Sequence, residues 1–231
     1  MSTLSGGPNI ILNGLVLNLD SANIRSYPGS GAIWTDLSRS GNIATLFNTP
    51  TFSNNVLNFD DASLEYATIP NIGNLTNWTI EAWFRLTAAV GTKVSSLVAN
   101  QFDGVNKLNF SIGTNNSPTN YNIAAGFFDG SWRSTTGFAP SVSVWYQVVG
   151  SYDSSVIRQY VNGVASGGTL NYVGTPQSGG EIRLMRRWDS ALTSANLLDG
   201  DLPIVRIYNR ALTATEVLQN YNTTKTRFGL F

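Results

Sequence analysis

The stretch YNRALTATEVLQNYNTTKTRFGLF, residues 208–231, stands apart from the sequence before it. Thr213 and Glu216 have the spacing of a capping box, in which each side chain accepts a hydrogen bond from a backbone N–H of the first helical turn. Leu212 and Val217 flank this pair as a hydrophobic staple. The stretch therefore predicts a short helix at this point of the chain.

The sequence upstream consists of short strand patterns separated by turn signals. In TIEAWFRL, residues 79–86, apolar and polar side chains alternate, as they do in residues 15–20. Asn162-Gly163 is typical of a type I′ hairpin, because both central residues of that turn need positive φ. Pro203 cannot donate to a ladder, so it predicts an edge position or the start of a strand. Residues 26–42, SYPGSGAIWTDLSRSGN, predict a long loop. The pattern as a whole predicts an all-β sandwich of two antiparallel sheets.

Composition excludes several classes of function. The chain has 231 residues, of which 42% are hydrophobic, which is enough for one sandwich domain. It has no Cys and no His, which excludes disulfides, thiolate nucleophiles, Ser-His-Asp triads and His- or Cys-ligated metals. Fourteen basic residues balance fourteen acidic ones, so we expect no nucleic-acid partner. No apolar run is long enough for membrane insertion.

Four separated segments resemble one family. They are FDDASLEYATIP (59–70), WTIEAWFRL (78–86), VWYQVVGSYDSSVIRQYVNG (144–163) and LDGDLPIVRIYNRALTATEVLQNY (198–221). In this order they resemble the concanavalin A-like jelly rolls of the laminin-G-like group. The resemblance implies a jelly-roll sandwich in which the last strand runs into a short C-terminal helix. It also implies an N-terminal arm (1–13), the domain (14–222) and a C-terminal tail (223–231).

Two segments near the ends of the chain make the resemblance more specific. GLVLNLDSANIRSYPGSGAIWTDLS (14–38) and NYNTTKTRFGL (220–230) look like stand-alone laminin-G-like proteins encoded by tailed bacteriophages. That resemblance implies a virion structural protein on the capsid or tail, with other virion proteins as partners and a homo-oligomer as one form of assembly. The N-terminus lacks a basic region and a continuous apolar run, so we expect synthesis in the host cytoplasm without a signal peptide.

A glycosidase of this fold typically carries two carboxylates on one strand in an E-x-D-x-E pattern, with alternate residues facing the cleft. No such run is present, since Glu81 has no carboxylate at 79 or 83. Glu216 is assigned to helix capping. We therefore expect no enzymatic activity and no catalytic residues.

Two acidic pairs on turns are candidate calcium ligands, because hard cations take carboxylate and carbonyl oxygens. They are Asp60 with Asp61 and Asp199 with Asp201. The alternative is that these carboxylates cap turns through Asx hydrogen bonds, and we favour it because acidic pairs on loops are common. Calcium is the one cofactor that the sequence suggests.

Glycan binding would use aromatic faces that stack on sugar rings, together with Asn, Asp and Arg side chains that bind hydroxyl groups. Three stretches have this composition: 99–104, 128–134 and 185–190. The candidate residues for binding a glycan or a protein interface are Asn100, Asp103, Trp132, Arg133, Arg187, Trp188 and Asp189. Trp78, Trp83 and Trp145 match framework positions of the family, and we assign them to packing.

The sequence therefore favours a non-enzymatic phage virion surface protein, either a capsid decoration or a fibre or tail component, that binds host-surface polysaccharide through its loops. One alternative is a secreted bacterial lectin-like module. Another is a polysaccharide hydrolase whose acids come from unrelated loops.

Overall fold

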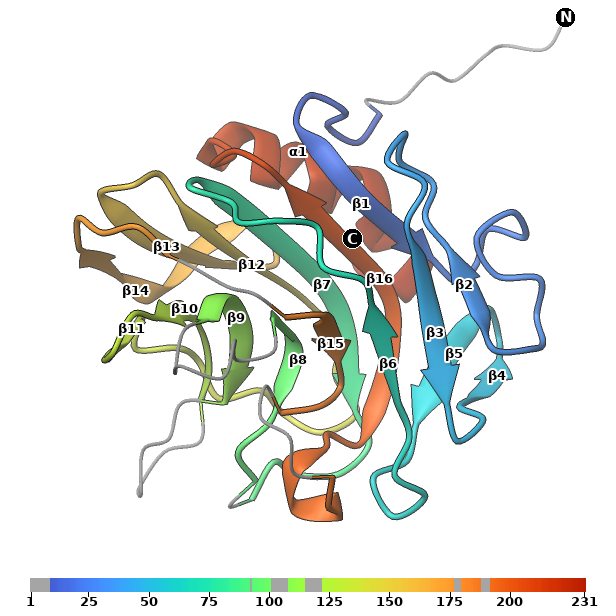
Figure 1. The fold of residues 1–231 in the computed structure, drawn as a ribbon. Helices are drawn as coiled ribbons and strands as arrows, with labels where there is room; N and C mark the ends of the chain where they lie inside the picture. The colour runs from blue at the N-terminus through green and yellow to red at the C-terminus, as the bar shows by residue number, and fades with distance from the viewer. Residues whose placement is uncertain (1–8, 92, 101–107, 115–121, 177–179, 188–191) are drawn as a thin grey trace, which may run out of the picture.

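The computed structural model describes residues 9–91, 93–100, 108–114, 122–176, 180–187 and 192–231. Within these residues, two eight-stranded antiparallel sheets pack face to face, and a C-terminal helix lies on the outside of one of them (Figure 1). The predicted all-β sandwich is confirmed.

The strands of each sheet come from distant parts of the chain. In order, sheet A consists of β14 (Val164–Asn171), β13 (Val156–Val161), β12 (Tyr146–Tyr152), β7 (Trp78–Leu86), β16 (Gly200–Tyr208), β5 (Val56–Phe59) and β4 (Thr51–Ser53), and β1 (Leu15–Asp20) also pairs with β16. In order, sheet B consists of β11 (Trp132–Ser134), β10 (Ile123–Phe128), β9 (Leu108–Thr114), β8 (Ser96–Asn100), β15 (Ile182–Leu184), β6 (Tyr66–Ile69), β3 (Ile43–Phe47) and β2 (Ile33–Thr35).

The main core lies between the two sheets. Ile80, Ala82 and Phe84 of β7 are fully buried in it, as the alternation of the sequence predicts. Burial of apolar area on this scale is the main favourable contribution to folding. Glu81 and Trp83 point to the opposite face of sheet A and are nonetheless fully buried.

The helix α1 (Ala214–Thr224) explains this second layer of burial. Thr213 and Glu216 form the predicted capping box, and Leu212 and Val217 are buried together in a small cluster against sheet A. A 3-10 helix, η2 (Lys225–Phe228), follows directly. Phe228 stacks on Trp83 with ring centroids 4.6 Å apart, so this part of the expected C-terminal tail packs on the domain.

The predicted hairpin turn is confirmed, since Asn162 and Gly163 join β13 to β14 with φ of 51° and 78°. The expectation that Pro203 lies at an edge or at the start of a strand was wrong. It lies within β16, a strand that has neighbours on both sides, at a register shift against β7 where no ladder hydrogen bond is required of it. The long loop expected at 26–42 was also wrong in part, because it contains β2, an edge strand that pairs with β3.

One further helix completes the description of the fold. The short 3-10 helix η1 (Ser194–Asn196) precedes β16. Among the residues that the structure describes, no helix is long and apolar enough to cross a membrane.

Candidate functional site

The β10–β11 hairpin, at one edge of sheet B, presents an aromatic side chain to solvent. Trp132 opens β11, directly across from Phe128. The two rings meet edge to face with centroids 5.4 Å apart, and 40% of Trp132 stays exposed. An indole that is fixed by a second ring but still exposed offers a surface for a ligand at small entropic cost.

Polar groups beside Trp132 are held in place by each other. The Arg133 guanidinium donates a 3.2 Å hydrogen bond from Nε to Asp129 Oδ1 and lies 4.3 Å from the ring centre of Tyr172. The Tyr172 hydroxyl donates to Asp129 Oδ2. Trp132, Arg133, Asp129 and Tyr172 are called the Trp132 cluster below. It combines two aromatic rings with an ion pair whose geometry is set before any ligand arrives.

The electrostatics of the cluster keep its carboxylate ionised. Burial opposes ionisation of Asp129, but hydrogen bonds from Tyr172 and Ser131 and the charge of Arg133 outweigh it and lower the pKa of Asp129. The same hydrogen bond to Asp129 raises the pKa of the Tyr172 hydroxyl. At neutral pH the cluster therefore presents a charged carboxylate, a guanidinium and a protonated phenol.

Asn100 was expected to face a ligand, and the structure does not support that role. Asn100 ends β8 opposite Ile182 of β15, and its side chain is fully buried. A buried side chain cannot contact a glycan from solvent. Neither atom of its amide has a hydrogen-bond partner among the described residues, which is costly in the interior of a protein. Asp103, from the same stretch, lies outside the described residues.

Arg187 is at the other end of sheet B from Trp132. The register of β15 against β8 pairs Ile182 with Asn100 and Leu184 with Val98, so the chain after Leu184 runs away from the β10–β11 hairpin. The Arg187 side chain donates a 3.4 Å hydrogen bond to Asn196. Trp188 and Asp189 lie outside the described residues. The candidate binding residues therefore do not form one continuous site.

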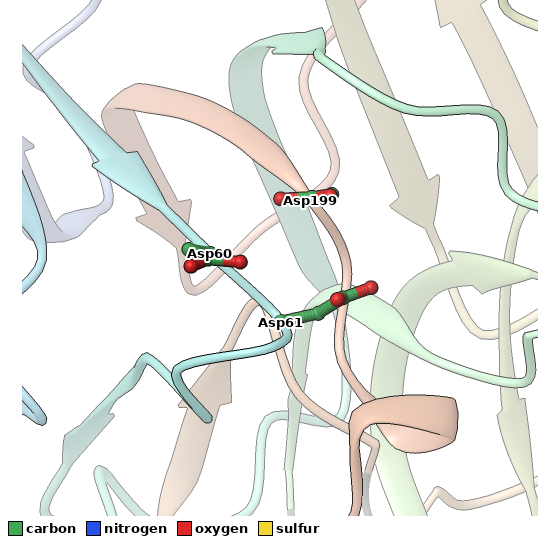
Figure 2. A group of neighbouring side chains, drawn as sticks. All are labelled: Asp60, Asp61 and Asp199. Atoms are coloured by element: carbon green, nitrogen blue, oxygen red, sulfur yellow. The ribbon is translucent and has the colours of Figure 1, made fainter.

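Three of the four candidate calcium ligands come together at this second end. Asp60 and Asp61 lie on the turn that follows β5, and Asp199 lies on the segment that leads into β16 (Figure 2). One carboxylate oxygen from each lies within 4.8 Å of the others. Such a set of oxygens suits a hard cation, and these are the residues that would hold a calcium ion.

The same three carboxylates also make contacts within the protein, as expected for the alternative that they cap turns through Asx hydrogen bonds. Asp60 accepts hydrogen bonds from Ala62 N at 2.9 Å and from Ser63 Oγ at 2.7 Å, which is an Asx turn and lowers its pKa. Asp61 forms an ion pair with Lys93. Burial and the charge of Asp60 raise the pKa of Asp199, against the effect of Lys93. A calcium ion could bind here only after Lys93 had moved away from Asp61.

Asp201, the fourth candidate ligand, is not part of this group. It lies directly opposite Arg85 in sheet A and accepts a 2.7 Å hydrogen bond from Arg85 Nε. Its other oxygen accepts from Asn58 at 3.0 Å. The cross-strand position therefore explains why this carboxylate joins an ion pair and not the acidic group.

Sequence comparison then decides the family. Residues 61–218, more than half of the chain, match Laminin_G_3, described as the concanavalin A-like lectin/glucanases superfamily. The chain belongs to this superfamily. A comparison with curated protein sequences gives no match.

Solved structures of the same architecture agree with this assignment. A Trypanosoma rangeli sialidase in complex with the inhibitor DANA has a TM-score of 0.64 and 16% identity, over 98% of this chain and 36% of that one. Domain 4 of AbnA, a GH43 extracellular arabinanase from Geobacillus stearothermophilus, in complex with arabinotriose, has a TM-score of 0.62 and 14% identity, over 91% of this chain and 100% of that domain. The binding domain of botulinum neurotoxin DC in complex with SialylT has a TM-score of 0.66 and 12% identity, over 91% of this chain and 51% of that one. The chain thus spans about a third of the sialidase, and at these identities the similarity concerns the fold.

The three tryptophans that were assigned to packing differ in their burial. Trp78 and Trp83 are fully buried, which confirms the assignment for both. Trp145 is only partly buried and lines a surface pocket.

Sequence reasoning missed Asp129 as a partner of Arg133 and missed Tyr172 altogether. Tyr172 is 43 residues from Asp129 in the sequence and meets it only because the edge strands β14 and β11 belong to sheets that face each other. The sequence gives no local signal for such a contact between sheets.

Proposed function

We propose that the protein is a non-enzymatic, carbohydrate-binding component of a phage virion surface, a capsid decoration or a fibre or tail part, which binds host-surface glycans through the Trp132 cluster. The Trp132 cluster is the observation that carries the binding proposal. Sugar rings bind through contact of their C–H faces with an indole and through charged groups that bind vicinal hydroxyls, and the cluster supplies both. The resemblance of residues 14–38 and 220–230 to phage virion proteins supports the location.

Two of the structural relatives support the ligand class. The arabinanase domain is in complex with arabinotriose and the neurotoxin binding domain is in complex with SialylT. Both have this sandwich architecture. They agree with a sandwich that binds a carbohydrate ligand.

The environment of Glu81 supports the absence of catalysis. Glu81 is the acidic residue of the β7 alternation and is fully buried. Its carboxylate accepts hydrogen bonds from Trp83, Gln147, Arg206 and Asn220, at distances from 2.7 to 3.1 Å. A carboxylate beneath a packed helix, with four donors, cannot reach a glycosidic bond.

The proposal is tested on a glycan array. We expect the wild-type protein to bind a defined set of glycans, and Trp132→Ala to lose at least about tenfold in affinity, which corresponds to about 1.4 kcal/mol and is within the range measured for nucleic-acid bases stacked on aromatic side chains. Trp132→Tyr keeps an aromatic face and should retain most of the binding. Val164→Ala, at an exposed hairpin position on the other sheet, serves as the matched control. If wild type and Trp132→Ala bind glycans equally well, the Trp132 cluster is not the binding site.

A second candidate is a secreted bacterial lectin-like module. The match to the arabinanase domain over its whole length favours it, because that domain is part of a larger extracellular enzyme. Mass spectrometry of purified virions separates the two candidates. A fixed copy number per particle supports the virion protein, whereas recovery only from bacterial culture medium supports the secreted module.

A further inference from the structure

A polar pocket lies on sheet A, away from the Trp132 cluster. Its volume is about 360 Å³, which is in the lower part of the range for small-ligand sites. It is called the Trp145 pocket here, and it is lined by Ala22, Ser53, Asn54, Asn55, Val56, Arg85, Trp145, Asp201, Arg227 and Phe228. Six separate segments of the chain meet there, at residues 22, 53–56, 85, 145, 201 and 227–228, so the pocket exists only in the folded domain.

The aromatic wall of the Trp145 pocket is rigid. The Trp145 ring lies 4.5 Å from that of Phe228, and the Arg85 guanidinium lies 4.9 Å from the centre of the Trp145 ring. Phe228 is in turn stacked on the buried Trp83. The indole of Trp145 is therefore held from two sides, while part of it remains accessible in the pocket.

The charged groups of the pocket already neutralise one another. Arg85 forms an ion pair with Asp201, with Nη2 to Oδ2 at 2.6 Å. Arg227 holds Asp20 through two 2.8 Å hydrogen bonds. Because each guanidinium has its own carboxylate, no charge is left that requires an ionic ligand. Paired Arg and Asp groups still offer further donors and acceptors to the hydroxyl groups of a neutral ligand.

The third wall of the pocket provides amides. Asn54 and Asn55 form the turn between β4 and β5, with φ of 52° and 65°. Both side chains are exposed and make no hydrogen bond within the described part of the chain. An amide presents a donor and an acceptor together, which matches a sugar hydroxyl.

We propose that the Trp145 pocket is a second carbohydrate site, which binds one neutral sugar unit of a glycan between the Trp145 indole and the Asn54–Asn55 turn. It shares the ligand class with the Trp132 cluster but none of its residues, so it stands or falls independently of that site.

The decisive variant is Asn54→Gly/Asn55→Gly. Glycine adopts positive φ without strain, so the turn and the fold are kept while both amides are removed. Asn162→Gly places Gly at a positive-φ position of the β13–β14 turn, outside the pocket, and is the control for the substitution itself; it also removes the 2.9 Å hydrogen bond that Asn162 Oδ1 accepts from Gln147 N. The probe is a series of neutral oligosaccharides, with inorganic sulfate as the anionic comparison. The readout is the Trp145 indole N–H signal in ¹⁵N-labelled protein, assigned with Trp145→Phe.

We expect neutral oligosaccharide to shift the Trp145 signal saturably, in wild type and in Trp132→Ala alike. The double Gly variant should lose about tenfold in affinity by this signal, as expected for one or two lost hydrogen bonds, and Asn162→Gly should bind as wild type does. No saturable shift with any neutral sugar, a response to sulfate alone, or unchanged affinity of the double variant would overturn the proposal. If Trp132→Ala has no effect on array binding while the Trp145 signal still shifts with neutral oligosaccharide, the result would support this pocket. The same result would exclude the Trp132 cluster as the glycan site.

Discussion

At the scale of single residues, Glu81 is the centre of the polar layer between sheet A and α1. Its carboxylate is fully buried and forms an ion pair with Arg206, whose side chain is 4% exposed. Asn220 of α1 donates to Glu81 and also to the Tyr208 hydroxyl, both at 2.9 Å. Burial of Tyr208 and the charge of Glu81 raise the pKa of that hydroxyl, so it stays protonated. One acidic side chain thus ties the helix to the sheet.

We predict that Glu81→Ala lowers the free energy of unfolding by about 3–5 kcal/mol, because Arg206 is left buried without a counter-charge. Urea denaturation followed by circular dichroism measures the change. The double variant Glu81→Met/Arg206→Met should recover part of the loss, because no buried charge then remains unpaired. A Glu81→Ala protein as stable as wild type would show that the pair is not needed to hold the helix.

Residue chemistry also shows what sequence could foresee of the candidate site. Trp132 and Arg133 were identified because an aromatic next to an arginine in a polar turn is visible locally. The role of Asn100 was predicted wrongly, because its polarity suggested exposure and its burial depends on the pairing of β8 with β15. Trp145 was assigned to packing alone because the pocket that it lines is formed together with Arg227 and Phe228, which are distant in sequence.

At the scale of elements, the N-terminus of α1 depends on the charge of Glu216. The Arg210 guanidinium donates to this carboxylate at 2.6 and 2.9 Å, and Thr213 N donates at 2.9 Å. These hydrogen bonds lower the pKa of Glu216 to about 2, and the bond from Arg210 has the largest effect. The capping box was predictable from sequence because it is local, whereas the contribution of Arg210 depends on where β16 ends.

The lowered pKa fixes the sign of a pH effect. In the unfolded chain the pKa of Glu216 should be about 4.3, so the contribution of its charge to stability is complete above that pH and is lost as the pH falls toward 2. We predict that Glu216→Gln is at most about 1 kcal/mol less stable than wild type at pH 7, because Gln can still complete the capping box but loses the partly exposed ion pair with Arg210. Urea denaturation at a series of pH values should show this difference shrinking through that window. A difference that stays constant down to pH 2 would contradict the assignment.

Short elements without a periodic pattern could not be predicted from the sequence. β2, within the expected loop at 26–42, is a three-residue strand between Gly- and Pro-rich turns, too short for an alternation to be visible. It forms because β3 offers it an edge. By contrast, β7 has nine residues with a clear alternation, and it was predicted.

At the scale of the whole molecule, the two candidate sugar sites lie in different parts of the sandwich and share no residue. The Trp132 cluster forms where the edge strands β11 and β14 meet, and the Trp145 pocket forms where η2 closes over sheet A. Sequence resemblance could predict the sandwich and its C-terminal helix, because those depend on patterns within each segment. It could not predict either site completely, because both are assembled by contacts between distant segments.

The central claim is that this sandwich binds glycan and leaves it intact. The most direct test is isothermal titration calorimetry with an array-selected oligosaccharide, followed by chromatography of the recovered sugar. The account predicts saturable binding by the wild-type protein, at least about tenfold weaker binding by Trp132→Ala, and an oligosaccharide of unchanged length. Shortened oligosaccharide, with the cleavage lost in Asp199→Asn, would instead identify a hydrolase and contradict the account.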